Sequence, residues 1–235
     1  MLALKNTWLY DMIGLVYPQL CCACKERLTK QEELICYHCL FQLPKTNFHL
    51  DVENPMVKYL AGLVPFEHAT ALYYFLKEGR VQELIHQLKY EERYEIGVKL
   101  GTQLGRQLKG VAHWQTLAGI VPVPLHPKKI RKRGYNQSDA IGEGVAKAMD
   151  LPLWSHALIR NTHSETQTKK SRTERWENVE SIFTVTDVDL LTNTHVLVVD
   201  DVMTTGSTLL ACAEQLLEVE GLKVSFGTLA WAGKF

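Results

Sequence analysis

Residues 195–210 read HVLVVDDVMTTGSTLL, and this stretch decides the fold. Residues 196–199 form a short, wholly apolar run, which is typical of a strand buried on both faces of a parallel sheet. Two carboxylates follow, then a loop of small hydroxyl residues with one glycine, and a helical pattern that begins at Ser207. Because ligands bind at the carboxyl ends of strands in open α/β sheets, we expect a binding site here.

The residue types in this stretch suit a phosphate that carries a sugar. A helix N-terminus offers free backbone N–H groups and the positive end of the helix dipole. Gly206 lets the backbone approach a ligand closely, and the carboxylates of Asp200 and Asp201 can accept hydrogen bonds from sugar hydroxyls. Further hydroxyl donors to the phosphate come from Thr204, Thr205, Ser207 and Thr208.

Other protein classes also place acids after an apolar strand. A Walker B strand needs a Gly-x-x-x-x-Gly-Lys-Ser/Thr partner and a dinucleotide-binding fold needs Gly-x-Gly-x-x-Gly, and neither run occurs. A receiver domain needs a phospho-accepting Asp downstream, and no Asp follows Asp201. The alternative that stays open is a helix-capping loop in which the acid pair has no function.

Strands and helices alternate along the chain from residue 69 onward. Apolar runs predict strands at 69–76, 117–123, 196–199 and 224–229, and helical periodicity predicts helices at 81–90, 96–108, 138–149 and 207–219. This alternation indicates an α/β fold with a mostly parallel central sheet flanked by helices. Residues 46–65 read as irregular, and residues 160–180 are polar without periodicity, which is typical of a functional or mobile loop.

Five of the six cysteines lie near the N-terminus, in two Cys-x-x-Cys pairs and one extra residue. Two residues between thiols let both sulfurs face one ion, and four thiolates satisfy tetrahedral Zn²⁺ in a closed, structural site. The alternative is a pair of disulfides, which a reducing cytosol disfavours. We expect Cys22 and His38 to be bystanders and Cys212 to be a buried core thiol. The expected zinc ligands are Cys21, Cys24, Cys36 and Cys39.

Composition limits the classes of function. The chain has 26 basic and 26 acidic residues, so binding to nucleic acid or to a membrane surface requires a local patch. No apolar run is long enough to span a bilayer, and residues 1–17 read as a short helix without a signal-peptide cleavage site. We therefore expect a cytoplasmic protein that is not an integral membrane protein. We also expect two units, a helix with a zinc module at residues 1–50 and an α/β domain at residues 55–235.

Residues 196–208 resemble the phosphoribosyl-pyrophosphate motif of type I phosphoribosyltransferases. The rest of the chain resembles one branch of them, the ComF (competence protein F, GntX-like) family, which has an N-terminal four-cysteine, zinc-ribbon-like module. The resemblance rests on that module and on four further segments, which are Leu88-Lys89-Tyr90, Val121–His126, the run Arg133-Gly-Tyr-Asn-Gln137, and Phe183 after a basic stretch. The extra Cys22 is the one departure from the family pattern.

The resemblance implies a role for each part of the site. Asp200 and Asp201 would contact the ribose hydroxyls as the catalytic pair, and residues 204–208 would hold the 5′-phosphate. The loop after the strand at 117–123 would receive the pyrophosphate, which normally arrives with Mg²⁺. Cations there would stabilise its charge, and a second basic segment in the polar loop would complete an electropositive rim. The expected rim residues are Lys128, Lys129, Arg131, Arg133, Lys169, Lys170 and Arg172.

Three functions remain open on the sequence alone. The first is a protein that binds phosphoribosyl pyrophosphate or a related nucleotide and handles single-stranded DNA in natural transformation, with DNA-uptake or recombination proteins as partners. Clustered cations beside Tyr135 and Trp176 would support backbone contact and base stacking. The second is an active phosphoribosyltransferase that moves ribose 5-phosphate to a base or amine. The third is a sensor that binds the ligand without turnover.

Overall fold

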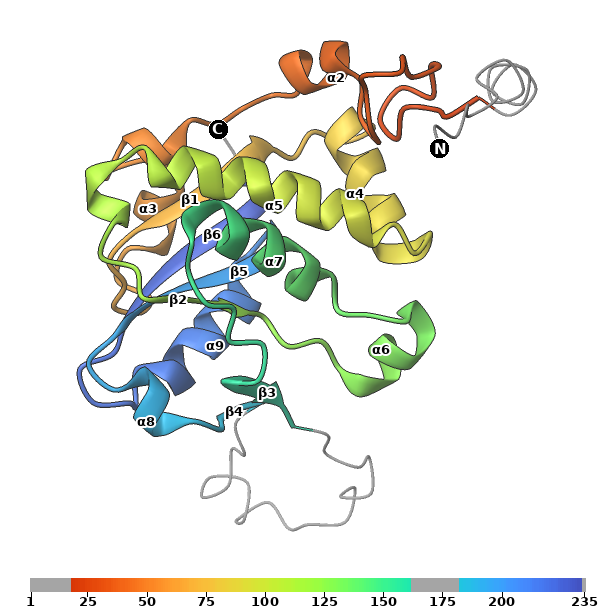
Figure 1. The fold of residues 1–235 in the computed structure, drawn as a ribbon. Helices are drawn as coiled ribbons and strands as arrows, with labels where there is room; N and C mark the ends of the chain where they lie inside the picture. The colour runs from red at the N-terminus through yellow and green to blue at the C-terminus, as the bar shows by residue number, and fades with distance from the viewer. Residues whose placement is uncertain (1–17, 162–181, 234–235) are drawn as a thin grey trace, which may run out of the picture.

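A computed structural model describes residues 18–161 and 182–233. Its centre is a four-stranded parallel sheet in the order β1-β6-β5-β2 (Figure 1). The strands are β1 (Ala69–Tyr74), β2 (Gly119–Pro122), β5 (His195–Met203) and β6 (Lys223–Trp231). The parallel sheet confirms the fold class that the alternation of strands and helices indicates.

Strand β5 is buried on both faces, as its apolar run predicts. Val196 and Val198 belong to one core cluster, whereas Leu197 and Val199 belong to the other. Because successive side chains of a strand point to opposite faces, every residue of the run packs against a layer of helices. The register brings Val199 opposite Gly227 on β6 and opposite Pro122 on β2.

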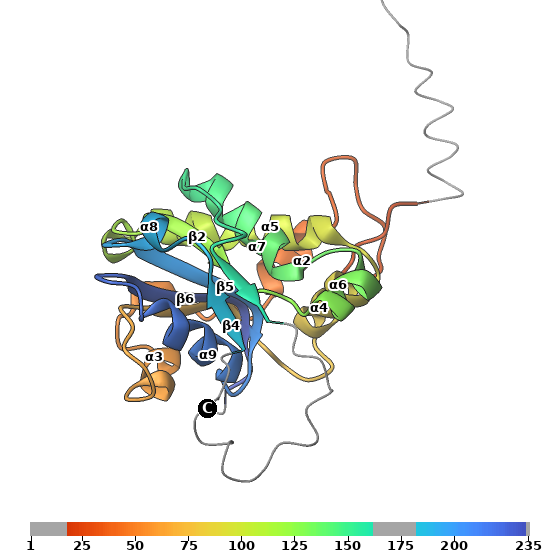
Figure 2. The same ribbon diagram turned by 90° about the horizontal axis from the view of Figure 1, so that it is seen from below.

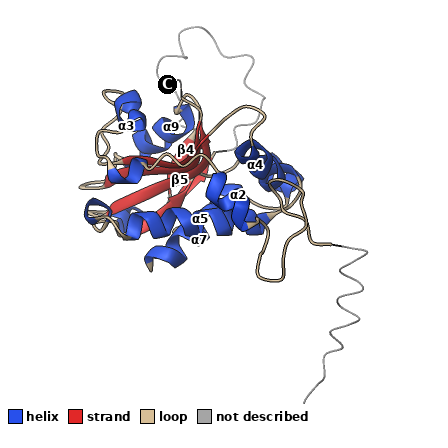
Figure 3. Cartoon of the chain, turned by 90° about the horizontal axis from the view of Figure 1, so that it is seen from above, coloured by secondary structure: helices blue, strands red, loops and turns tan. Residues whose placement is uncertain are grey.

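Helices cover both faces of the sheet (Figure 3). Helices α5 (Tyr94–Lys109) and α7 (Gln137–Met149) lie on one face, and α3 (Pro55–Leu60) and α9 (Ser207–Leu216) lie on the other. Glycines let α5 and α7 approach closely, since a Cβ atom on Gly101 would lie 2.1 Å from the Ile141 carbonyl oxygen.

The remaining elements are short, apart from α4 (Arg80–Tyr90). Helix α6 (Pro127–Arg133) follows β2, and α4 follows β1, so both start from the carboxyl edge of the sheet, and they lie near each other (Figure 2). The other elements are α2 (Tyr37–Gln42), α8 (Val188–Leu191), the antiparallel pair β3 (Leu158–Arg160) and β4 (Phe183–Val185), and the 3-10 turns η1 (Phe48–Leu50) and η2 (Ala112–Trp114).

The structure departs from the sequence prediction in three places. Strand β5 continues to Met203, so the two acids lie within the strand and not after its end. Residues 46–65, read as irregular, contain α3, which begins because the Asn54 side chain accepts hydrogen bonds from the N–H groups of Met56 and Val57. The basic segment after β2 is a helix, which Pro127 starts and Gly134, with a φ of 81°, ends.

Two predicted features lie outside the described residues, namely the helix at residues 1–17 and nearly all of the polar loop at residues 160–180. Among the helices that the structure describes, none has the length and apolar character needed to cross a membrane.

Candidate ligand site at the carboxyl edge of the sheet

The acid pair lies near the end of β5. Asp200 is half-buried, and its Oδ1 accepts hydrogen bonds from the backbone N–H of Asp201, at 2.8 Å, and from the hydroxyl of Ser138, at 3.0 Å. Ser138 lies in the first turn of α7, so the helix that follows the Arg-Gly-Tyr-Asn-Gln run fixes this carboxylate. One oxygen of Asp200 is therefore held by the protein itself.

Asp201 is buried, with 4% of its surface exposed. Its Oδ1 lies 2.8 Å from the Lys89 ammonium nitrogen, and its Oδ2 is buried without a hydrogen-bond partner among the described residues. Buried polar atoms in native proteins almost always have a partner, so an unpaired carboxylate oxygen indicates a place for a ligand donor.

The two carboxyl groups differ in their surroundings. Burial, and then the neighbouring charge of Asp201, raise the pKa of Asp200 to about 7, although the Asp201 N–H and the Ser138 hydroxyl oppose that shift. A second negative charge at this position is therefore unfavourable until a cation or a hydroxyl donor arrives.

The loop after β5 is suited to an anion. Gly206 is the N-cap of the ten-residue helix α9 and has no side chain to cap it, and the first N–H, of Ser207, makes only a long hydrogen bond of 3.5 Å to Thr205 Oγ1. Its φ of 76° favours glycine, and a Cβ atom there would lie 3.1 Å from Leu60 and 3.3 Å from Met203. The hydroxyl-bearing residues Thr204, Thr205, Ser207 and Thr208 are all exposed. The hydroxyls of Thr205 and Ser207 lie 2.8 Å apart and hydrogen-bond to each other, and phosphate binding by this exposed loop stays a prediction.

The segment after β2 is tied to its surroundings by side chains. Asn136 donates from Nδ2 to the Val123 carbonyl, at 3.1 Å, and its Oδ1 accepts from the N–H of Ser138. The Tyr135 hydroxyl donates to the Leu88 carbonyl of α4. The Tyr135 hydroxyl therefore joins two elements, and the stacking of a base on its ring stays a prediction.

The predicted basic rim is only partly assembled by the described residues. On α6, Lys129, Lys132 and Arg133 face a pocket that Lys89 also lines. Lys128 and Arg131 do not line that pocket. Lys169, Lys170 and Arg172, together with Trp176, lie outside the described residues.

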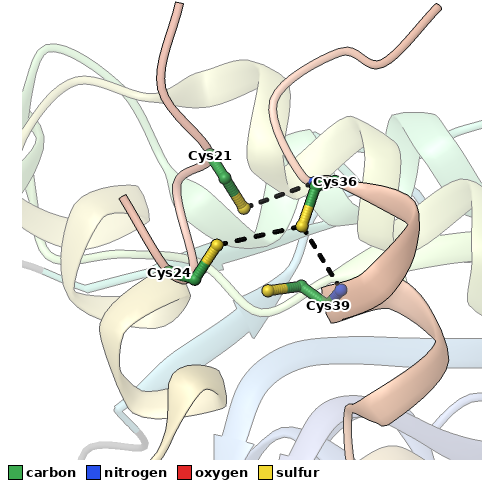
Figure 4. A group of neighbouring side chains, drawn as sticks. All are labelled: Cys21, Cys24, Cys36 and Cys39. Atoms are coloured by element: carbon green, nitrogen blue, oxygen red, sulfur yellow. Dashed lines mark hydrogen bonds between the residues drawn. The ribbon is translucent and has the colours of Figure 1, made fainter. Parts of the chain in front are cut away.

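The four predicted zinc ligands gather at one point (Figure 4). The Sγ atoms of Cys21, Cys24, Cys36 and Cys39 all lie within 4.8 Å of one another, and those of Cys24 and Cys36 are 3.8 Å apart. A tetrahedral site with Zn–S bonds of ~2.3 Å requires sulfurs about 3.8 Å apart, so the geometry fits a metal ion. Cys22 and the exposed His38 are not part of this group, as the spacing predicts.

Backbone groups favour the thiolate form at Cys21, whereas burial raises the pKa of Cys36 and of Cys39 in the absence of a cation. The N–H groups of Ala23 and Cys36 point to the Cys21 Sγ, at 3.4 and 3.3 Å. Burial opposes ionisation of Cys21, but the backbone donors outweigh it and lower the pKa to about 7. Metal binding requires thiolates, so this arrangement suits a metal ligand.

The four-cysteine module contacts the rest of the chain through α4. The buried side chain of Gln87 donates to the Cys22 carbonyl at 2.7 Å, and Lys25 pairs with Glu83 at 2.6 Å. The cysteines also belong to the same core cluster as Leu84 and Leu88 of α4. Helix α4 therefore contacts the four-cysteine module on one side and, through Lys89, the acid pair on the other.

Comparison with known proteins identifies the family. A model of the phosphoribosyl transferase domain matches residues 140–234. Competence protein F of Haemophilus influenzae is 34% identical over 108 residues, which are 45% of this chain and 47% of that protein. Competence protein ComFC of Bacillus subtilis is 37% identical over 99 residues, 42% of this chain and 38% of its own. The DNA utilization protein YhgH of Escherichia coli is 30% identical over 218 residues, which are 89% of each chain.

The chain belongs to the ComF family. Its α/β part has the type I phosphoribosyltransferase fold, with a four-cysteine cluster near the N-terminus. The resemblance seen in the sequence is thereby confirmed. The match spans about half the length of the Haemophilus protein and most of the length of the Escherichia protein.

The sequence analysis assigned no role to two residues of this ComF-family site, namely Lys89 and Ser138. Both lie far from Asp200 and Asp201 along the chain and reach them only through the fold. Lys89 lies within the run Leu88-Lys89-Tyr90, and Ser138 directly follows the run Arg133–Gln137. Both runs indicate the family, but they do not indicate what the two residues contact.

The raised pKa of Asp200 makes stability depend on pH. The unfolded carboxyl ionises near pH 4, but burial raises the folded-state pKa to about 7, so the wild type loses stability as pH rises through that window. Asp200→Asn does not ionise, and we expect it to raise the free energy of unfolding by about 1 kcal/mol at pH 8, or ~2–4 °C in Tm. Thermal unfolding followed from pH 4.5 to pH 8 measures this.

The matched control is Asp189→Asn, an exposed acid on α8, which should shift Tm equally at every pH. A stabilisation by Asp200→Asn that did not grow with pH would contradict this account of the acid pair.

Proposed function

We propose that this ComF-family protein binds 5-phosphoribosyl-1-pyrophosphate with Mg²⁺ at the carboxyl edge of the sheet. The observation that carries the proposal is the pair of half-buried Asp200 and buried Asp201, with the unpartnered Oδ2 of Asp201, shortly before a hydroxyl-rich loop and the start of α9. Few ligands combine vicinal hydroxyls with a phosphate close to them. Ribose 5-phosphate has both groups, and its hydroxyls would give Asp201 the donor that it lacks.

Each part of the ligand has a proposed partner. The 5′-phosphate lies on residues 204–208, where amides and hydroxyls converge at a helix N-terminus. The ribose hydroxyls contact Asp200 and Asp201. The pyrophosphate faces the segment after β2 and the cations Lys89 and Lys129, which offset its charge. Mg²⁺ is held mostly by phosphate oxygens and waters, as this ion prefers.

The biological setting we propose is the handling of single-stranded DNA during natural transformation, in the cytoplasm. Relatives of this chain are called competence proteins and DNA utilization proteins. The chain has equal numbers of acidic and basic residues, so the contact with a polyanion is assigned to the basic helix α6 at the ligand site. DNA-uptake or recombination proteins would then act as partners.

A second candidate is catalysis of phosphoribosyl transfer, which the pocket beside Lys89 favours because an acceptor needs space next to the ribose. In that reaction the bond from the ribose C1 to the pyrophosphate oxygen breaks, and an acceptor nitrogen forms the new bond to C1. The nitrogen loses one proton, and pyrophosphate leaves with the electron pair. Release of pyrophosphate in the presence of an amine or base would distinguish an enzyme from a sensor that only binds.

We also propose that the four-cysteine site holds one structural Zn²⁺. Four sulfurs leave no open coordination position, which is typical of structural zinc sites. The ion would hold together a segment whose regular structure is limited to short elements.

The ligand proposal predicts the effect of single substitutions. Thr205→Val removes a phosphate donor and Asp201→Asn removes a charged acceptor, and a charge-assisted hydrogen bond contributes about 1.5–3 kcal/mol. We expect each variant to weaken binding of phosphoribosyl pyrophosphate by about ten- to a hundredfold in millimolar Mg²⁺. Isothermal titration calorimetry on the full chain measures the dissociation constants.

The control is Thr184→Val, the same substitution at an exposed threonine on β4, which should leave the affinity unchanged. Absence of binding by the wild type in millimolar Mg²⁺ would refute the proposed function.

The zinc proposal predicts one zinc ion per chain by elemental analysis. Cys36→Ser combined with Cys39→Ser should abolish the zinc and unfold the module, because zinc binding by such modules is worth ~10–16 kcal/mol. Cys22→Ser alters a buried thiol outside the cluster and should retain the metal. Zinc-free wild-type protein, or full zinc content in the double variant, would contradict this assignment.

A further inference from the structure

The C-terminal turn of α4 and helix α6 enclose a pocket of about 290 Å³. The two walls contact each other, since the Arg133 guanidinium carbon of α6 lies 5.3 Å from the Tyr90 ring centroid and the Tyr135 hydroxyl, just after α6, donates to the Leu88 carbonyl of α4. A pocket with fixed walls loses little entropy when it binds a ligand. Its lining residues are Lys89, Tyr90, Glu92, Lys129, Lys132 and Arg133.

The charge of this pocket favours a phosphate. Four of its six lining residues are cations and one is an acid, in a chain that has no net charge. Lys132 and Arg133 follow Lys129 by three and four residues on α6. At this spacing the three side chains lie on one face of the helix. Within residues 18–161 and 182–233, neither Lys129 nor Lys132 makes an ion pair. Their charges are available to an anion.

One aromatic ring in the pocket is exposed and held in place. Tyr90 is 60% exposed, and the Arg133 guanidinium carbon lies 5.3 Å from its ring centroid. His86, one turn earlier on α4, is tilted against the same ring at 5.0 Å. Stacking on an exposed aromatic ring is how many proteins hold a nucleic acid base. A base, with its attached phosphate, therefore matches both the ring and the cations.

The pocket adjoins the acid pair. Lys89 lines it, and the Lys89 ammonium nitrogen lies 2.8 Å from Asp201 Oδ1. We propose that this pocket binds one nucleotide unit, with its base against Tyr90 and its phosphate between Lys129 and Lys132. The placement beside a bound phosphoribosyl group rests on the proposed function. The nucleotide has two sources, a free mononucleotide or one unit of a DNA single strand, and the experiment below separates them.

The test compares two equally exposed tyrosines in the full-length protein. Fluorescence anisotropy with a labelled dT12 strand, and calorimetry with dTMP, measure affinity for the wild type, Tyr90→Leu and Tyr37→Leu. Tyr37 is 61% exposed on α2 and lines a different groove. We expect Tyr90→Leu to weaken binding about tenfold, as the loss of one stacking contact does, and Tyr37→Leu to change it less than twofold.

A second pair of variants tests the phosphate contact. Lys132→Gln should weaken binding of dT12 and lower its logarithmic salt slope by about 0.7, the change for one phosphate contact on a single strand. Lys147→Gln, at an exposed lysine on α7 outside the pocket lining, should leave both quantities unchanged. Both positions are exposed, so neither substitution threatens folding.

Each outcome bears on the proposal. Binding of dTMP that depends on Tyr90 assigns the site to a free nucleotide, whereas Tyr90-dependent binding of dT12 alone assigns it to a strand. No binding of either probe, or equal losses in the Tyr90 and Tyr37 variants, would overturn the proposal.

Phosphoribosyl pyrophosphate should bind Tyr90→Leu as it binds the wild type. Failure of that ligand to bind the wild type, with Tyr90-dependent dT12 binding intact, would remove the proposed function but not this pocket.

Discussion

The ion pair between the partly exposed Lys89 and the buried Asp201 is the interaction on which the arrangement of the site depends. It holds the C-terminal turn of α4 against the end of β5, and the same helix is bound to the four-cysteine module through Gln87 and Glu83. The Lys89 side chain keeps 23% of its surface exposed, so solvent weakens this pair relative to a fully buried one. Direct contacts thus connect the four-cysteine module to α4, and α4 to the acid pair.

The site keeps features that disfavour the unliganded protein. Asp200 and Asp201 are adjacent carboxyls near the end of a buried strand, the pKa of Asp200 is raised by burial, and one oxygen of Asp201 has no partner among the described residues. Natural proteins retain such local conflicts mainly at functional sites. A ligand that brings hydroxyl donors and a divalent cation would give the unpartnered oxygen a donor and offset the charge of the two carboxylates. The groups that destabilise the unliganded protein would then contribute to the binding energy.

The sequence predicts the parts of this structure that depend on local patterns. The apolar run at residues 196–199 predicts a strand buried on both faces, and the two Cys-x-x-Cys pairs predict the cysteine cluster, because the residue types and their spacing suffice in both cases. The extension of β5 to Met203 was missed because pairing with β6, and not local pattern, continues the strand past the acids. Helix α6 was read as a loop because it has no buried residue and so no apolar face. The contact of Lys89 with Asp201 depends on the packing of α4, which no local pattern specifies.

Hydrogen exchange measured by mass spectrometry tests the central claim most directly, because it locates the ligand without any substitution. The wild-type chain would be compared with and without phosphoribosyl pyrophosphate at saturating concentration in Mg²⁺. If the amides at the start of α9 hold the 5′-phosphate, exchange slows in peptides covering residues 204–208 and is unchanged in α2, on the four-cysteine module. Protection that spares residues 204–208 at saturation, or that is confined to other elements, would contradict the account.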